Sequence, residues 1–121
     1  MAKHILVVDD EPFTIQILTL RLVANGYLVD SASDGADMLA KLADFKPDAI
    51  LLDVMMPRID GTQLADLLGQ MPDLADIPII FHSALISPDL PQDSPVNPHH
   101  HYLSKTAEPE VLLALLKRIG V

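Results

Sequence analysis

Short runs of apolar residues alternate along the chain with longer stretches in which apolar residues recur at helical spacing. The short runs are rich in β-branched side chains, and such runs are typical of strands buried on both faces of a parallel sheet. Strands are expected at 4–10, 27–32, 48–53, 77–82 and 101–105. Helices are expected at 12–25, 34–45, 62–71 and 108–120. This alternation predicts an α/β fold, a doubly wound domain around a five-stranded parallel sheet.

One segment interrupts the alternation. Residues 85–101, LISPDLPQDSPVNPHHH, contain Pro88, Pro91, Pro95 and Pro98 at the place where a fourth helix should precede the last strand. A proline inside a helix costs about 3 kcal/mol, because it removes a hydrogen bond and clashes with the preceding turn. We therefore expect at most one turn of helix in this segment, and otherwise an extended, hydrated loop.

The first predicted helix has two apolar stripes on nearly opposite sides. They are formed by Phe13, Ile17, Leu20 and Ala24, and by Ile15, Leu18 and Leu22. One stripe must face the sheet. We expect a neighbouring helix to cover the other, with presentation to a partner protein as the alternative.

Polar side chains follow the ends of four predicted strands. Asp9 and Asp10 end the first strand, Asp53 ends the third, Ser83 follows the fourth and Lys105 ends the fifth. The carboxyl ends of parallel strands lie at the same edge of a sheet, where open α/β sheets bind their ligands. The sequence therefore predicts that these five side chains share one edge.

Such a group of side chains suits phosphoryl transfer. Three neighbouring carboxylates repel one another, and Mg²⁺ relieves this repulsion because it prefers oxygen ligands. A lysine and a hydroxyl suit the remaining oxygens of a phosphoryl group, and Asp53 is the candidate nucleophile. Taken singly, Asp9 and Asp10 could cap a helix, Ser83 could be a turn residue and Lys105 a solvated lysine. Their coincidence at the strand ends favours a site.

The composition narrows the range of partners. The chain has 121 residues, so we expect a single domain over 1–121. Its formal net charge of −9 disfavours direct binding to nucleic acid or to an anionic membrane surface. It contains no cysteine, which excludes disulfides and thiol chemistry. With no signal sequence and no apolar segment of membrane-spanning length, a cytoplasmic protein is expected.

The sequence resembles the receiver domain of two-component response regulators over essentially the whole chain. The matching motifs are ILVVDDEP, LLDVMMPRIDG, FHSA and YLSK. Ser83 follows Asp53 by thirty residues and precedes Lys105 by twenty-two, as in that family. The resemblance implies the strand order 2-1-3-4-5.

The resemblance also implies roles for individual residues. Asp53 would accept a phosphoryl group from a phosphohistidine. Mg²⁺ would be bound by the carboxylates of Asp10 and Asp53 and by the backbone carbonyl of Met55, with Asp9 contributing through a water molecule.

Four further residues would act around the phosphoryl group. Lys105 would pair first with Asp53 and then with the phosphoryl group, to which Ser83 would turn as a switch residue. Tyr102 would turn inward behind Ser83. Pro57 and Gly61 would shape the phosphorylation loop.

The partners implied are a histidine kinase or a histidine phosphotransfer protein upstream, and an unidentified protein downstream. The sequence leaves open whether the chain forms a homodimer. The chain would be a switch and not a turnover enzyme, since it catalyses only its own phosphorylation and dephosphorylation. No output domain follows Val121, so the chain is either a single-domain regulator or part of a longer protein.

The chain departs from the family pattern in two places. The family usually has Lys-Pro with a cis bond after the last strand, whereas this chain has Lys105-Thr106. The Pro-rich segment and His99-His100-His101 alter the region that commonly forms the family's signalling face. We expect the three histidines to form the hydrated end of a loop, with a metal site as the alternative.

Two rival functions differ from the phosphorylated switch. A receiver-like scaffold that acts without phosphorylation would not need the three acids, Ser83 and Lys105. An FMN-binding protein would share the topology, but the residues DDEPFT after the first strand are too acidic for a phosphate-binding loop without a metal.

Overall fold

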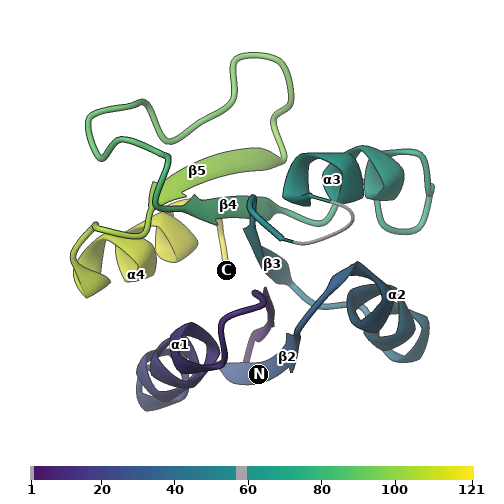
Figure 1. Ribbon diagram of the computed structural model, residues 1–121, viewed down its shortest axis with the longest axis horizontal. Coiled ribbons are helices and arrows are strands. Elements are labelled where there is room, and N and C mark those ends of the chain that lie inside the picture. The colour runs from purple at the N-terminus through teal and green to yellow at the C-terminus, as the bar shows by residue number, and fades with distance from the viewer. Residues whose placement is uncertain (1, 57–59) are drawn as a thin grey trace.

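A computed structural model describes residues 2–56 and 60–121 and shows a five-stranded parallel sheet. The strands lie in the order β2-β1-β3-β4-β5, as expected (Figure 1). Their bounds are β1 His4–Val8, β2 Leu28–Ala32, β3 Ala49–Asp53, β4 Ile79–Ser83 and β5 His100–Ser104. Every residue of β3 and β4 is buried, which explains why these strands are apolar without a polar face.

Helices cover both faces of the sheet (Figure 1). Their bounds are α1 Pro12–Ala24, α2 Gly35–Asp44, α3 Gly61–Gly69 and α4 Pro109–Arg118. Because side chains alternate along a strand, Ile5 and Val7 of β1 pack with α1 and α4, whereas Leu6 and Val8 pack with α2 and α3. This arrangement confirms the doubly wound α/β fold.

Local signals in the sequence fix where the helices begin and end. Asp60 caps the first turn of α3 in a capping box with Gln63, so α3 starts at Gly61, the last residue of the LLDVMMPRIDG motif. Gly26 has φ +88°, which allows the chain to reverse after α1 and enter β2. These two signals fix the start of α3 after β3 and the turn from α1 into β2.

The Pro-rich segment forms turns and no helix, as expected from its four prolines. It runs along the outer edge of β5 (Figure 1). Ser94 N–H donates to the carbonyl of His100 at 3.1 Å, and Tyr102 N–H donates to the carbonyl of Gln92 at 2.6 Å. The segment therefore supplies hydrogen bonds to an edge strand that would otherwise be open.

One charged side chain joins this segment to both β5 and α4. Asp93 accepts a hydrogen bond from Nδ1 of His101 at 2.8 Å and two from the guanidinium of Arg118 at 2.9 and 3.0 Å. Arg118 first, and then His101, hold the pKa of Asp93 down at about 2. Asp93 is thus ionised at neutral pH and anchors the segment.

The structure corrects the expectation for the three histidines. His100 and His101 are residues of β5 and not the hydrated end of a loop. The ring of His100 makes an edge contact with Phe81, with 5.2 Å between ring centroids, while His101 is buried and bonded to Asp93. The expectation was wrong because both rings have specific partners, Phe81 in the neighbouring strand β4 and Asp93 in the Pro-rich segment.

The structure also corrects the expectation for the second stripe of α1. Leu18 and Leu22 are buried against the sheet. On the other side, however, Phe13 and Leu20 are each 65% exposed, so no neighbouring helix covers them. α4 shares a core cluster with Leu18 and Leu22 and so packs on the side of α1 that faces the sheet.

Two further observations bear on the sequence-based expectations. The described residues contain no cis peptide bond, so Lys105-Thr106 is trans. Among the residues that the structure describes, no helix combines the length and the apolar character needed to cross a bilayer.

Replacing Arg118 by Gln should loosen the Pro-rich segment from β5, because Asp93 loses its strongest partner. We expect the amide protons of Ser94 and Tyr102 to exchange about two- to fivefold faster, the range that exposed charged contacts support. Lys117→Gln removes the same charge from the neighbouring position and should leave both amides unchanged. Equal exchange rates in wild type and Arg118→Gln would show that the segment is held without this network.

Candidate functional site

Three carboxylates meet at the carboxyl edge of the sheet. Asp9 and Asp10 follow β1 directly, and Asp53 is the last residue of β3. The two strands are adjacent, with Val8 level with Leu52, so Asp9 lies beside Asp53. One oxygen from each of the three carboxylates lies within 4.8 Å of the other two. The sequence-based grouping of these acids is therefore present in the structure.

The three acids differ in exposure. Asp9 and Asp53 are only 1% and 4% exposed, whereas Asp10 is exposed. Backbone amides hold the two buried carboxylates: Glu11 N–H donates to Oδ1 of Asp9 at 2.9 Å, and Met55 N–H donates to Oδ1 of Asp53 at 3.2 Å. One oxygen of each buried carboxylate is thus fixed, and the other is turned toward the site.

Lys105, the residue after β5, brings the counter-charge. Its Nζ lies 2.9 Å from Oδ2 of Asp9 and 3.4 Å from Oδ2 of Asp53. The shorter distance is to Asp9, although the family pattern suggested Asp53 as the partner. Oδ2 of Asp9 is fully buried and makes no hydrogen bond of acceptable geometry with a described residue, despite its short distance to the ammonium. It therefore retains an unused lone pair.

Burial and repulsion set the proton affinities at the site. Burial raises the pKa of Asp53, and the charge of Asp9 raises it further, against the opposing effects of Met55 N–H and Lys105. Burial disfavours the ammonium of Lys105, but its contacts with Asp9 and then Asp53 outweigh this and raise its pKa. Lys105 is therefore charged at neutral pH and only partly compensates the acids.

The donor set fits a hard divalent cation. Three carboxylates face one ammonium, which leaves a local excess of negative charge, and Oδ2 of Asp9 is buried without a hydrogen bond. Hard cations such as Mg²⁺ take oxygen ligands from one or two carboxylates and from water. The residues present offer oxygen donors at suitable spacing.

Ser83 and Lys105 are joined through the backbone. Ser83, 1% exposed, is the last residue of β4, and its carbonyl accepts a hydrogen bond from Lys105 N–H at 3.0 Å. Its hydroxyl oxygen accepts from Leu85 N–H at 3.1 Å, which leaves the O–H proton available to a further acceptor. The structure thus brings Ser83 to the same edge as the acids.

Tyr102 lies farther from the carboxylates than Ser83 and is half-buried. Its ring stacks on Phe81, with 5.5 Å between centroids and 21° between the planes. Together with Leu85, Leu90 and Pro91 it lines a groove under the Pro-rich segment. Tyr102 therefore links β5 to that segment.

The loop after β3 contains two residues singled out by the sequence. A Cβ on Gly61 would overlap the carbonyl oxygen of Asp53 and come within 3.0 Å of Cα of Val54, so only glycine fits this close approach. Pro57 lies outside the described residues. The side chain of Met55 is exposed, and its backbone bears on Asp53 through the amide described above.

Sequence reasoning missed His82. It precedes Ser83 in β4, on the side of the sheet that faces α1 and α4, and is 8% exposed. Burial, and then the nearby charge of Lys105, lower its pKa to about 4. The alternation of β4 places His82 on the same face as Ile80, and this was the signal that could have revealed it.

Comparison with known proteins identifies the family of this chain. The family model described as response regulator receiver domain matches residues 5–117. Response regulator MprA of Mycobacterium ulcerans is 43% identical over 84 residues, which are 69% of this chain and 35% of that protein. The chain thus spans about a third of the length of the curated relatives it matches.

Solved structures have the same fold. The chemotaxis response regulator CheY4 of Vibrio cholerae has a TM-score of 0.84 at 30% identity, covering 98% of this chain and 99% of that one. Response regulator TrrA from Thermotoga maritima, solved in complex with Mg²⁺-BeF, has a TM-score of 0.80 at 31% identity, covering 97% and 98%. The chain belongs to the receiver domain family of two-component response regulators.

Proposed function

We propose that this chain, as a single receiver domain over 1–121, is a phosphoacceptor switch that takes a phosphoryl group onto Asp53. The observation that supports the proposal is the cluster at the sheet edge, where the Asp9, Asp10 and Asp53 oxygens lie within 4.8 Å and Lys105 reaches two of the acids. The immediate donor is a phosphohistidine of a histidine kinase or a histidine phosphotransfer protein.

In the proposed reaction, a carboxylate oxygen of Asp53 attacks the phosphorus of the phosphohistidine. An O–P bond forms, the P–N bond breaks, and the imidazole leaves with the electron pair and takes up a proton from solvent. The product is an acyl phosphate on Asp53. Because Met55 N–H holds Oδ1 of Asp53, the carboxylate is oriented before the donor arrives.

The carboxylates of Asp10 and Asp53 and the backbone carbonyl of Met55 would hold Mg²⁺, with Asp9 contributing through water. When bound, the ion neutralises negative charge on the acids and on the transferring phosphoryl group. Lys105 is close enough to Asp53 to move from the carboxylate to a phosphoryl oxygen. The chain's catalysis is confined to its own phosphorylation and dephosphorylation.

Ser83 supplies the conformational readout in this proposal. Its O–H is free to donate to the phosphoryl group, while its oxygen already accepts from Leu85 N–H. A phosphoryl group on Asp53 therefore favours the conformation in which Ser83 and the following residues approach the site. Tyr102, which packs beside these residues, would turn inward with them.

The downstream partner is a protein, because the net charge of −9 disfavours direct contact with nucleic acid. The location proposed is the cytoplasm, where histidine kinases present their phosphorylated domains.

A homodimer formed through the altered face around β5 is an alternative to the monomer.

Asp53 should be the residue that carries phosphate. Wild type incubated with acetyl phosphate and Mg²⁺ should gain the mass of one phosphoryl group, in an acid-labile form, by intact-protein mass spectrometry. Asp53→Asn should gain none, and Asp44→Asn, which removes an exposed acid from the end of α2, should behave as wild type. Stoichiometric phosphate on Asp53→Asn would overturn the assignment, and no phosphate on wild type would favour a phosphorylation-independent scaffold.

Mg²⁺ should stabilise the fold through Asp10. At a concentration tenfold above its Kd, a ligand bound only by the folded state adds about 1.4 kcal/mol to the free energy of unfolding. The midpoint of a thermal melt should therefore rise by a few degrees in wild type and in Asp44→Asn. Asp10→Asn should lose most of this rise, and an unchanged response of that variant would contradict the role of Asp10.

Removing the charge of Asp53 should stabilise the metal-free chain at neutral pH. Its folded pKa is raised by burial and by Asp9, so its contribution to stability is largest below the unfolded pKa and falls as pH rises through the folded pKa. Asp53→Asn should therefore melt at a higher temperature than wild type at pH 7 in EDTA, and this difference should shrink as the pH is lowered.

The matched variant Asp44→Asn should show no such gain. A lower melting temperature for Asp53→Asn at pH 7 would mean that attraction to Lys105 outweighs the burial of Asp53 and its repulsion by Asp9.

A further inference from the structure

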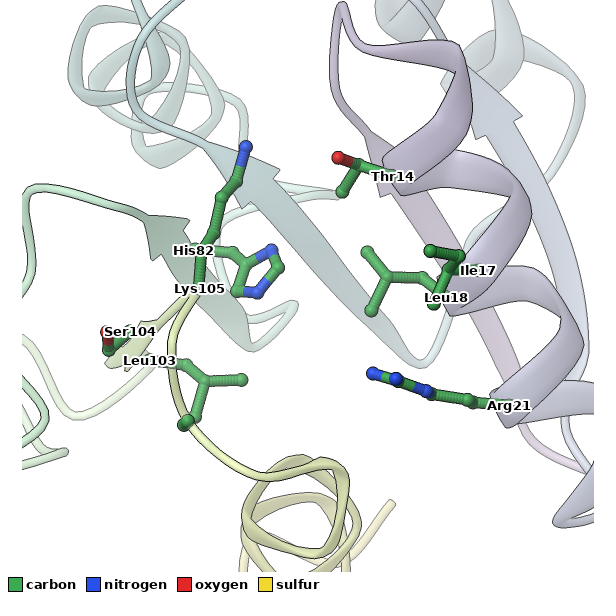
Figure 2. A pocket seen from close by; sticks show the side chains of 9 residues that line it. Thr14, Ile17, Leu18, Arg21, His82, Leu103, Ser104 and Lys105 are labelled. Carbon is green, nitrogen blue, oxygen red and sulfur yellow. The ribbon is translucent and has the colours of Figure 1, made fainter.

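A second hollow lies on the α1 side of the sheet, behind the carboxylate site. It has a volume of about 260 Å³ and lies between α1 and the connection from β5 to α4 (Figure 2). Its apolar wall is formed by Ile17, Leu18 and Leu103. The stem of Lys105 also borders it, but the ammonium points away toward Asp9 and Asp53 (Figure 2).

Two buried polar residues line this pocket, His82 and Ser104, and the hydroxyl of Ser104 is hydrogen-bonded to Thr106. Figure 2 shows the ring of His82 extending from β4 into the space between α1 and Leu103. The residue is only 8% exposed and its ring nitrogens make no hydrogen bond with any described residue, but neither nitrogen is fully buried, so both are accessible from the pocket. A neutral imidazole carries one N–H donor and one acceptor, so His82 can offer a hydrogen bond to a molecule in the pocket.

Arg21 brings a cation to the other side of the same hollow. It lies in the last turn of α1, and its guanidinium extends toward the pocket (Figure 2). Within residues 2–56 and 60–121 its side chain makes no ion pair, and no carboxylate is among the residues lining the pocket. The pocket thus combines an uncompensated positive charge, an N–H donor and the hydroxyl of Thr14 with an apolar wall.

We propose that this pocket binds a small organic carboxylate with a compact apolar body. The carboxylate pairs with Arg21 and accepts a hydrogen bond from His82, while the apolar body packs on Ile17, Leu18 and Leu103. The size is adequate, since a cavity of about 150 Å³ accommodates benzene. Inorganic phosphate is a poorer match because it has no apolar part to cover the wall.

The test uses benzoate as the probe. Benzamide serves as the uncharged control, and inorganic phosphate as the control without an apolar part. Binding is measured by titration calorimetry and by amide chemical shifts on the unphosphorylated chain without Mg²⁺, so the outcome does not depend on phosphotransfer. Arg21→Gln changes an exposed residue and should fold normally. Lys41→Gln removes the same charge from α2, on the opposite face of the sheet.

Wild type and Lys41→Gln should bind benzoate saturably, with the largest shifts at Leu18, Arg21 and Leu103. Arg21→Gln should weaken binding at least tenfold, since it leaves the carboxylate without its ion pair. His82→Leu should weaken it as well. Benzamide and phosphate should bind more weakly than benzoate in wild type.

Three results would overturn the proposal. The first is absence of saturable benzoate binding at millimolar concentration. The second is equal affinity in wild type and Arg21→Gln, or shifts centred on the groove under the Pro-rich segment instead of on α1. The third is phosphate binding as tight as benzoate binding, which would leave no role for the apolar wall.

Discussion

Two buried carboxylates that share one ammonium are the central constraint of this molecule. Asp9 and Asp53 are almost fully removed from water, and both face Lys105, which lies nearer to Asp9. Burying a carboxylate without compensation is costly, and a single cation cannot balance these two acids together with Asp10. A bound cation or a bound proton would relieve the remaining negative charge at the sheet edge. The same burial and repulsion raise the pKa of Asp53, which can be measured.

The sheet supplies the rigidity that keeps these charges together. β1 and β3 are hydrogen-bonded neighbours in the middle of the sheet, so their carboxyl ends cannot separate without breaking the core. Gly61 lets the start of α3 approach the backbone of Asp53, and the capping box at Asp60 holds that helix in place. Substituting Gly61 would therefore disturb the site through the backbone of Asp53, even though glycine has no functional group.

Most of the fold and much of the site follow from the sequence, and the exceptions have physical reasons. Strand ends are marked by a change from apolar to acidic residues, which placed Asp9, Asp10 and Asp53 correctly. Whether the outer apolar stripe of α1 is buried or exposed depends on which helices pack beside α1. The periodicity of the sequence does not show which helices are neighbours. His100 and His101 were misjudged because their partners, Phe81 in β4 and Asp93 beyond the edge of β5, are brought to them only by the fold.

The Pro-rich segment shows how the site and the altered face are connected. Lys105 N–H is bonded to the carbonyl of Ser83, which links the residue that carries the cation of the site to the end of β4, two residues before this segment begins. From Ser83 the chain runs through turns to Asp93, which is bonded to β5 and α4. A rigid helix would transmit a displacement of Ser83 along its axis. A chain of turns held at Asp93 would transmit it only as far as that anchor, so in the proposed switch the surface between Ser83 and Asp93 would express a change at Asp53.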